Sequence, residues 1–486
     1  MAAADELRHT EPAIRADWLE AVAAAVAEAS DELVPIAHEE TGIPLARLAG
    51  EVERTVNQLR LFADVCREGS FLEVIIDHPV PDARPIPSPD VRRFLIPLGP
   101  VAVFSASNFP FAFGVAGGDT ASALAAGCPV IVKAHPGHPR LSDATAAVVA
   151  KALVAAGAPA GAFGLIHGTD NGRALVAAPG ITAVGFTGSL EGGRALFDIC
   201  AARPDPIPFY GELGSLNPVI ITATRAISDA PAIATGFVGS LTTSAGQLCT
   251  KPGLLLVPAG SGIAEAAAEA AADVPIGRLV SSRIAAGFTN AVARWESVPN
   301  VRRLTTSPTV PLERPILVAT DVPTLLDHAD TLLVEAFGPG AIVVEYGTEG
   351  QLNEVVEALP AALAGAIFGT ADDPFVPGLA RSLERKVGRL IFDGWPTGVW
   401  VTWGMHQGGP YPATTSTLHT SVGATSIRRW LRPVAYQNWP QSLLPLVLRD
   451  SSRGPRRVDG RLTNFDAPRP AADQRPSTAP PLTPMT

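Results

Sequence analysis

One cysteine in this chain stands in a setting that suits covalent chemistry. Cys249 lies in the stretch Gly246-Gln247-Leu248-Cys249-Thr250-Lys251-Pro252-Gly253, whereas the other three cysteines lie within apolar runs. The residues before this stretch have the pattern of a helix end, and residues 254–257 have the pattern of a buried strand. A thiol at such a junction can be reached by a substrate, and nearby backbone N–H groups could stabilise its thiolate. The ordinary alternative is a buried structural cysteine.

Four other polar residues stand at the ends of expected strands or in turns. Asn108 follows one strand in a loop flanked by aromatic residues, and Lys133 ends the next strand. Ser189 opens a helix soon after another strand ends, and Glu212 lies in a glycine-rich turn. Taken singly, each has an ordinary structural reading: a turn former, a solvated strand end, a helix cap and a surface carboxylate. The residues by themselves leave both readings open.

The elements that must position these residues alternate regularly along the chain. From residue 99 onward, short apolar runs alternate with helical segments, and strands are expected at residues 100–104, 129–133, 163–167, 182–186 and 218–221. Such alternation predicts a parallel sheet with helices on both faces, an α/β architecture that binds nucleotides at the carboxyl ends of its strands. Residues 11–37 and 44–66 are expected to form two packing helices.

We expect three further regions around this first sheet. Residues 1–75 and 96–222 are assigned to a dinucleotide-binding domain, and residues 223–410 to a catalytic α/β domain. A proline-rich interruption at residues 80–87 favours a protruding hairpin or edge ribbon over 76–95. Residues 450–486 are rich in Pro, Arg, Ser, Asp and Thr, a composition typical of a disordered tail.

Composition excludes several classes of function. Of the 486 residues, 47% are hydrophobic and 17% charged, which indicates a packed protein of two or three domains. The net charge of −10 and the lack of a basic run argue against nucleic-acid binding. His135 and His138 have no third ligand at suitable spacing, so no metal site is expected. The uncharged run 94–118 contains Pro, Gly and Asn residues that would break a membrane helix, and no signal peptide is visible. A cytoplasmic protein is therefore expected.

Taken together, the polar positions resemble the aldehyde dehydrogenase superfamily over about residues 11–440. Six motifs carry the resemblance, in the order and at close to the spacings of that family: Ser107-Asn108-Phe109-Pro110, Val132-Lys133, Phe186-Thr187-Gly188-Ser189, Glu212-Leu213-Gly214, Gly246-Gln247-Leu248-Cys249 and Glu335-Ala336-Phe337-Gly338-Pro339. The resemblance implies a Rossmann-type cofactor domain, an α/β catalytic domain and a small β extension over 76–95 and 424–440. In that family the extension joins subunits, which implies a homodimer or homotetramer.

The resemblance also implies roles for individual residues. Cys249 would attack an aldehyde, and the Asn108 amide would donate to the resulting oxyanion, together with the Cys249 N–H. Glu212 would activate the water that hydrolyses the thioester. Contacts with the cofactor would come from ten residues: Lys133, His135, Pro136, Phe186, Thr187, Gly188, Ser189, Leu213, Glu335 and Phe337.

The cofactor is expected to be NADP, with NAD as an alternative. Pro136 stands where NAD-preferring relatives often carry a carboxylate, and Lys133 and His135 would be available to a 2′-phosphate. If the Lys-Ala-His-Pro stretch is only a turn, NAD would serve.

Several stretches resemble an NADP-using branch that contains 2-oxoglutarate semialdehyde (2,5-dioxopentanoate) dehydrogenases and fatty-aldehyde dehydrogenases: residues 55–60, 133–136, 408–414, 420–423 and 429–437. An anionic substrate needs a cation at its far end, and Arg60 is one candidate; its alternative is a surface ion pair. Phe109 and Trp403 are expected near the substrate.

Three features depart from the branch: a shorter N-terminus, the proline-rich tail, and Trp400, Trp403 and Gln407 near the expected substrate entrance. Aliphatic aldehydes are therefore an alternative substrate. Transfer of the thioester to coenzyme A is disfavoured by Glu212, and a degenerate, non-catalytic family member is disfavoured by the complete set of Asn108, Glu212 and Cys249.

Overall fold

The computed structural model describes residues 2–306 and 308–463. The chain divides into two compact units, one formed by residues 1–67 and 96–432 and the other by residues 68–95 and those from 433 onward. The first unit contains two largely parallel sheets with their helices, and the second contains a five-stranded mixed sheet.

The amino-terminal part of the first unit is built on a five-stranded parallel sheet in the order β5-β4-β3-β6-β7. Its strands are β3 (Val101–Phe104), β4 (Val130–Lys133), β5 (Phe163–Ile166), β6 (Ala183–Thr187) and β7 (Phe209–Glu212). The register pairs Phe104 with both Lys133 and Phe186, and Thr187 with Glu212. The carboxyl ends of four strands therefore lie level at one edge, which brings together several of the polar positions found in the sequence.

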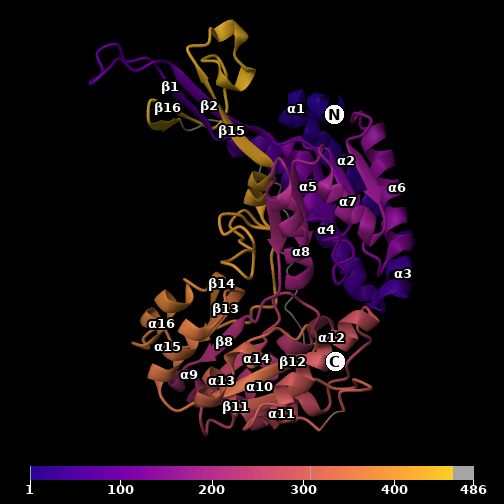
Figure 1. The fold of residues 1–486 in the computed structure, drawn as a ribbon, viewed down its shortest axis with the longest axis vertical. Helices are drawn as coiled ribbons and strands as arrows, with labels where there is room; N and C mark the ends of the chain where they lie inside the picture. Colours follow the sequence, from indigo (N-terminus) through magenta and orange to yellow (C-terminus); the bar gives the residue numbers. More distant parts are fainter. Residues whose placement is uncertain (1, 307, 464–486) are drawn as a thin grey trace, which may run out of the picture. The chain divides into compact units, whose positions relative to one another are not determined.

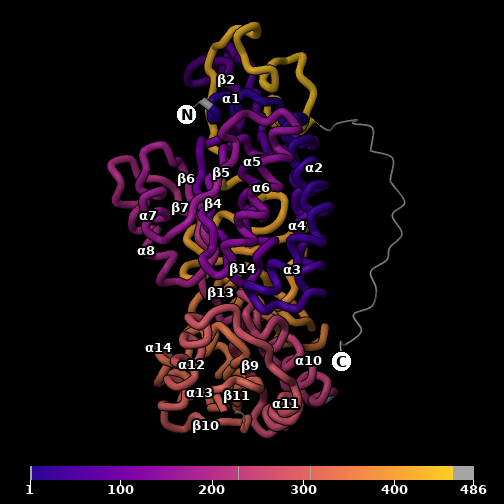
Figure 2. Tube along the Cα trace, turned by 90° about the vertical axis from the view of Figure 1, so that its right-hand side faces the viewer, coloured from indigo at the N-terminus to yellow at the C-terminus, as the bar shows by residue number. Residues whose placement is uncertain are grey.

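Helices cover both faces of this sheet (Figure 2). One face is packed by α7 and α8, the other by α5 and α6, with further helices outside them. Their bounds are α1 (Ala2–His9), α2 (Pro12–Glu28), α3 (Ser30–Thr41), α4 (Leu45–Glu68), α5 (Gly118–Ala126), α6 (Pro139–Ala155), α7 (Thr169–Ala177) and α8 (Leu190–Ala202). The single helix expected over 11–37 is instead two helices, because the chain breaks at Ala29 and starts again at Ser30.

The prediction that residues 218–221 form the last strand of the first sheet is wrong. β8 (Pro218–Ile221) belongs to the second sheet, and the fifth strand of the first sheet is β7, in the stretch expected to be a turn. A short apolar run such as β8 can pack in either sheet, and its tertiary partners decide which. The chain therefore leaves the first sheet after Glu212, ten residues before the expected boundary at 222.

The second sheet of this unit has seven strands in the order β10-β11-β12-β9-β8-β13-β14. Figure 1 labels β8, β11, β12, β13 and β14 of this sheet. Its other strands are β9 (Leu254–Pro258), β10 (Arg302–Arg303), β11 (Ile316–Asp321), β12 (Gly340–Tyr346), β13 (Ala362–Phe368) and β14 (Val387–Phe392), all parallel except β10.

Two apolar cores cover the faces of the seven-stranded sheet. One contains Phe288 and Trp295 of α12, and the other contains Phe237 of α10. The helices are α9 (Ala223–Ser228), α10 (Ala230–Thr242), α11 (Ile263–Ala272), α12 (Ser282–Glu296), α13 (Val322–Asp327), α14 (Ala329–Leu332), α15 (Glu349–Ala358) and α16 (Val376–Leu383). Both sheets confirm the α/β fold class.

The second unit is a five-stranded sheet in the order β15-β2-β1-β16-β17. Its strands are β1 (Val74–Asp77), β2 (Val91–Pro97), β15 (Leu431–Gln437), β16 (Arg456–Val458) and β17 (Arg461–Thr463). β1 and β2 form the expected antiparallel hairpin around the proline-rich interruption.

The predicted disorder of the tail is wrong for residues 450–463. There β16 pairs with β1 and β17 pairs with β16, and this backbone pairing outweighs the polar composition of the segment. Residues 464–486 lie outside the described part of the chain.

Candidate active site

The loop that carries Cys249 begins with an unusual backbone. After α10, Ser244 and Ala245 have φ values of 54° each and Gly246 has 68°. Side chains disfavour this left-handed region, and such strain collects at functional sites. Gly246 is required here because a Cβ would lie 2.4 Å from the carbonyl oxygen of Gly338. The cysteine motif and the Glu335-to-Pro339 motif therefore meet directly.

Asn217 holds the same loop from the seven-stranded sheet. Its Nδ2 donates to the carbonyl oxygens of Cys249 at 2.8 Å and Lys251 at 2.9 Å. Its Oδ1 accepts from the N–H of Ala364, in β13, at 3.1 Å. The sequence analysis missed this residue, although asparagine in a glycine-rich stretch tolerates left-handed backbone, and its φ is 48°.

Glu212 lies beside Cys249, and both contact Gln407. The Nε2 of Gln407 lies 3.4 Å from Glu212 Oε1 and 3.5 Å from Cys249 Sγ. The other carboxylate oxygen of Glu212 accepts a hydrogen bond from the Ser421 hydroxyl. Glu212 and the thiol are also hydrogen-bonded to each other. Gln407 and Ser421 come from the last part of the first unit, about 160 and 170 residues after the cysteine. The sequence analysis named Gln407 only as a departure near the expected substrate entrance, and it missed Ser421.

Asn108 reaches the cysteine loop from the first sheet. Its Nδ2 donates to the carbonyl oxygen of Gln247 at 2.8 Å, two residues before Cys249. Helix α4 fixes the loop that carries it: Arg47 donates to the Asn108 carbonyl at 2.9 Å, and Glu51 Oε1 accepts from the N–H groups of Phe111 and Ala112. The structure thus brings together an amide, a carboxyl group and a thiol from three distant segments.

Burial controls the charges in this cluster. It raises the pKa of the Cys249 thiol well above its ordinary value, and the neighbouring Glu212 raises it further. Burial also raises the pKa of Glu212, against the hydrogen bonds from Ser421, Cys249 and Gln407 that favour its charged form. The expectation of a stabilised thiolate is therefore wrong for this arrangement: a neutral thiol stands next to the carboxyl group that can take its proton.

The Lys133 side chain lies at the carboxyl edge of the five-stranded sheet, along the first turn of α7 at Gly172. It is half-buried, and within residues 2–306 and 308–463 no hydrogen-bond or ion-pair partner of its ammonium is found. Burial lowers its pKa. His135 is neutral, because burial and then the charges of His138, Lys133 and Arg283 lower its pKa to about 3. It can offer a 2′-phosphate an N–H but no charge; Pro136 is exposed.

The helix that follows Phe186-Thr187-Gly188 begins close to the sheet. Ser189 caps α8 by accepting from the N–H of Gly192. A Cβ on Gly193 would lie 2.2 Å from Leu213, so the helix amino terminus approaches the Glu212-Leu213 segment only because that residue is glycine. An open helix end at a sheet edge is suited to a phosphate group.

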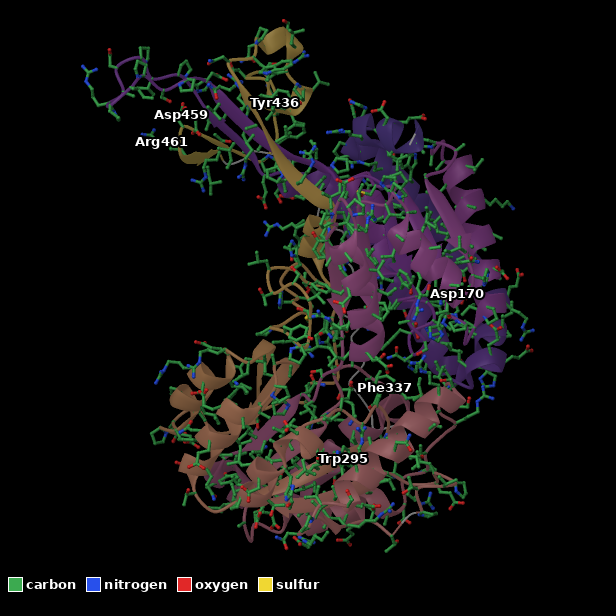
Figure 3. The ribbon with its side chains drawn as sticks, in the orientation of Figure 1. Asp170, Trp295, Phe337, Tyr436, Asp459 and Arg461 are labelled. Atoms are coloured by element: carbon green, nitrogen blue, oxygen red, sulfur yellow. The ribbon has the colours of Figure 1, made fainter. Side chains whose placement is uncertain are left out.

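Glu335 and Phe337 lie on the other side of the cysteine loop. A Cβ on Gly214 would come within 2.6 Å of the Glu335 carboxylate. Burial raises the pKa of Glu335 to about 7, while the nearby Lys251 opposes this shift. Phe337 lies where the two α/β parts of the first unit meet (Figure 3). Lys251 is buried and donates to the Gly340 carbonyl at 2.6 Å.

The three expected substrate residues have different settings. Arg60 is 48% exposed and pairs with Glu20 at 3.7 Å, so it forms the surface ion pair that was its alternative reading. Trp403 is 48% exposed. Phe109 lies under two guanidinium groups, with Arg47 at 4.7 Å and Arg54 at 5.4 Å from its ring centre. The sequence analysis missed Arg54.

Arg54 is an unpaired cation beside the cluster. Among the described residues, its Nε and Nη2 are buried without a hydrogen-bond partner. Burial lowers the pKa of Arg54, and the charges of Glu51, Cys249 and Glu212 oppose this shift. The carboxyl group of Glu212 and the thiol of Cys249 therefore lie within electrostatic range of an arginine that binds neither.

Two α/β sheets with a cysteine, a carboxyl group and an amide between them are typical of dehydrogenases that use a catalytic thiol. The chain belongs to the aldehyde dehydrogenase family, whose model matches residues 1–399. It is 44% identical to alpha-ketoglutaric semialdehyde dehydrogenase 2 of Azospirillum brasilense, over 94% of this chain and 89% of that protein. It is 40% identical to alpha-ketoglutaric semialdehyde dehydrogenase of Acinetobacter baylyi, over 92% and 86%.

Solved structures share the fold. Thermus 1-pyrroline-5-carboxylate dehydrogenase with bound NAD matches with a TM-score of 0.75 and 20% identity, over 90% of this chain and 83% of that one. Bradyrhizobium japonicum proline utilization A matches with a TM-score of 0.76 and 23% identity over 90% of this chain, which spans only 44% of that protein.

Two kinds of feature are absent from the described residues. Within residues 2–306 and 308–463, no helix has the length and apolar character needed to cross a bilayer. In the same part of the chain, no three His, Cys, Asp or Glu side chains are grouped in a way that would hold a metal ion.

Proposed function

We propose that this enzyme oxidises 2,5-dioxopentanoate to 2-oxoglutarate, with NADP as its preferred cofactor. The two relatives named above for alpha-ketoglutaric semialdehyde support the substrate. The observation that carries the proposal is the unpaired guanidinium of Arg54 beside Cys249 and Glu212.

The chemistry follows from the cluster. Cys249 Sγ attacks the aldehyde carbon while its proton passes to Glu212, and the Asn108 amide and the Cys249 N–H donate to the oxyanion that forms. Removing one such donor costs about 3–4 kcal/mol of barrier. A bound nicotinamide would supply the acceptor for the hydride of the aldehyde carbon. Glu212 must first release the thiol proton to solvent, and it then takes a proton from the water that hydrolyses the Cys249 thioester. Gln407 keeps the carboxylate and the sulfur in place.

Arg54 suits the far carboxylate of this substrate. A buried charge without a partner is costly, and a carboxylate can accept two parallel hydrogen bonds from a guanidinium. The rings of Phe109 and Phe113, at 5.4 and 5.8 Å, support the guanidinium from one side. A carboxylate on the substrate would therefore complete an interaction that the protein leaves open.

The test compares Arg54→Met with the control Arg60→Met, which removes an arginine from the same helix. We expect Arg54→Met to lower kcat/KM for 2,5-dioxopentanoate by about 30-fold or more, since truncating a buried charge pair costs about 2–5 kcal/mol. For hexanal, kcat/KM should change little, and Arg60→Met should leave both substrates unaffected. Equal losses with both aldehydes would remove the substrate assignment while leaving the reaction class intact.

The residues around Lys133 fit a cofactor with a 2′-phosphate. Lys133 has an unpaired ammonium, Arg283 lies close enough to act on His135, and position 136 has no carboxylate. Leu213, Glu335 and Phe337 would border the nicotinamide end, and the α8 amino terminus would hold the pyrophosphate.

We expect kcat/KM to be higher with NADP than with NAD, and Lys133→Met to remove most of this preference. Pro136→Glu should reverse it, because a carboxylate repels the phosphate and can bind a ribose hydroxyl. Equal use of NADP and NAD by the unaltered enzyme would contradict the preference.

A second substrate class is favoured by one observation. Trp400 and Trp403 are 69% and 48% exposed on the segment near the expected entrance, and apolar side chains there suit long aliphatic aldehydes. If decanal gives a higher kcat/KM than 2,5-dioxopentanoate, this alternative replaces the proposed substrate.

We also propose that the enzyme is a homodimer or a pair of dimers. In the second unit, β15 and β17 are the edge strands of the sheet, and such edges can pair with another chain. Sedimentation equilibrium should give a mass at least twice that of the 50.4 kDa chain; a monomer at micromolar concentration would contradict it.

A further inference from the structure

A small polar cavity borders Glu212. Its volume is about 20 Å³, which is enough for one water molecule. Most of the residues that line it have polar side chains, and those that can pass a proton include Glu212, Ser416, His419 and Ser421.

Hydrogen bonds already join these residues in pairs at the two ends of the cavity. At one end the Ser421 hydroxyl bonds to Glu212 Oε2 and lies 3.1 Å from the Gln407 carbonyl. At the other end the Ser416 hydroxyl lies 2.7 Å from His419 Nδ1. Glu212 is 3% exposed, whereas His419 is only half-buried. The cavity therefore separates a buried carboxyl group from a histidine with access to solvent.

We propose that His419 carries protons from Glu212 to solvent through Ser421, one water in this cavity and Ser416. The inference rests on the proposed function, in which Glu212 must pass the thiol proton to solvent before it can activate the hydrolytic water. The protonated carboxyl group gives its proton to Ser421 Oγ, and Ser421 gives its own to the water. The water passes a proton to Ser416 Oγ, Ser416 passes its own to His419 Nδ1, and the proton on Nε2 leaves. Each hydroxyl ends with one proton, as it began.

The surroundings of His419 suit an acceptor that releases its proton again. Burial, followed by the charges of Arg429 and Arg428, lowers its pKa, so the ring is neutral at neutral pH. The Tyr210 ring packs edge-on at 4.9 Å, and Arg429 is itself paired with Asp119 at 2.6 Å. A neutral imidazole in this setting accepts a proton only briefly.

The experiment separates formation of the thioester from its hydrolysis with p-nitrophenyl acetate, which acylates the thiol without any cofactor. We compare His419→Phe and Ser416→Ala with the control His167→Phe, an exposed histidine bonded to Asp143. Nitrophenolate release is followed from the first turnover, with 5–200 mM imidazole or formate added. The steady-state rate should fall about tenfold to hundredfold in His419→Phe, since a proton-transfer group contributes about 10²–10⁴-fold and water can partly replace it.

Three results would support the relay: an undiminished first burst, a slow steady state, and a rate that rises with buffer concentration in His419→Phe but not in His167→Phe. Ser416→Ala tests the relay a second time with the imidazole left in place, and this variant should also lower the steady-state rate. A steady-state rate unchanged in His419→Phe, or lowered but unresponsive to buffer, would overturn the relay. Ester hydrolysis that persists in Cys249→Ala would instead overturn the proposed function.

Discussion

At the scale of the residue, Glu212 and Cys249 form a coupled pair. Each pKa is raised by burial, so the two groups share protons and the carboxyl group can serve both the attack and the hydrolysis. Glu212→Gln preserves shape and removes proton transfer. We expect the first burst with p-nitrophenyl acetate to slow, because the neutral thiol loses its proton acceptor, and hydrolysis to fall by about 10²–10⁴-fold.

The same pair predicts a pH dependence. The base must be ionised, and its pKa lies above the ordinary value, so hydrolysis by the unaltered enzyme should fall as the pH drops through that raised pKa. In Glu212→Gln this acid limb should vanish from the pH–rate profile. An acid limb that stays in place would assign it to another group.

The position of Gln407 leads to a further prediction at the scale of the residue. Its Nε2 lies between Glu212 and Cys249, and its Oε1 is buried without a partner in the described structure. Gln407→Leu should slow hydrolysis and shift the acid limb upward, because the carboxylate loses a donor that favours its charged form. Gln407→Glu should slow it more, since a second carboxyl group would stand beside the first. If Gln407→Leu leaves the acid limb where it is, the side chain does not act on Glu212.

At the scale of the element, helix α4 positions the Asn108 loop. Glu51 is buried and accepts from the N–H groups of Phe111 and Ala112. Glu51→Ala would leave two buried donors unsatisfied and should destabilise the protein by roughly 2–6 kcal/mol, at about 1–3 kcal/mol for each donor. Glu53→Ala, on the exposed side of the same helix, is the control.

Thermal unfolding and ester hydrolysis measure the two consequences of Glu51→Ala. The midpoint temperature of thermal unfolding should fall. At temperatures where the protein stays folded, kcat should fall as well, because Asn108 loses its fixed position. A loss of stability with full activity would show that Glu51 supports the fold alone.

At the scale of the whole molecule, the second unit has its own charge network. His78 contacts Asp459 at 2.9 Å and Asp450 at 3.4 Å, and Arg92 joins Asp90 to Asp450. The hydrogen bond to Asp459 raises the pKa of His78. The pKa values of Asp450 and Asp459 are lowered, that of Asp450 chiefly by the hydrogen bond from Arg92.

The signs of these shifts define a window of pH for the stability of this unit. The contribution of His78 is complete below pH 6.5 and is lost as the pH rises through its raised pKa. The contributions of the two aspartates are present above 3.8 and are lost as the pH falls through their lowered pKa values. Hydrogen exchange in residues 74–77 and 456–463 should therefore be slowest between about pH 4 and 6.5, after correction for the intrinsic rate. In His78→Asn the alkaline loss of protection should disappear.

The sequence by itself determined the reaction class and most of the local structure. The six motifs include the groups to which we assign the chemistry, and the alternation of strands and helices fixes an α/β fold because each period buries one apolar face. The tertiary structure decided which elements meet. Arg54 and Arg60 share helix α4, but six residues turn a helix by about 240°, so only packing determines which guanidinium meets the site.

The same reason explains the other differences. β8 joined the second sheet because its partners lie there, Gln407 and Ser421 reached Glu212 from a remote segment, and residues 456–463 became strands by pairing with β1 and with each other. The sequence gives the type of each side chain directly. Contacts between distant segments depend on the packing of the whole chain, so no local sequence pattern predicts them.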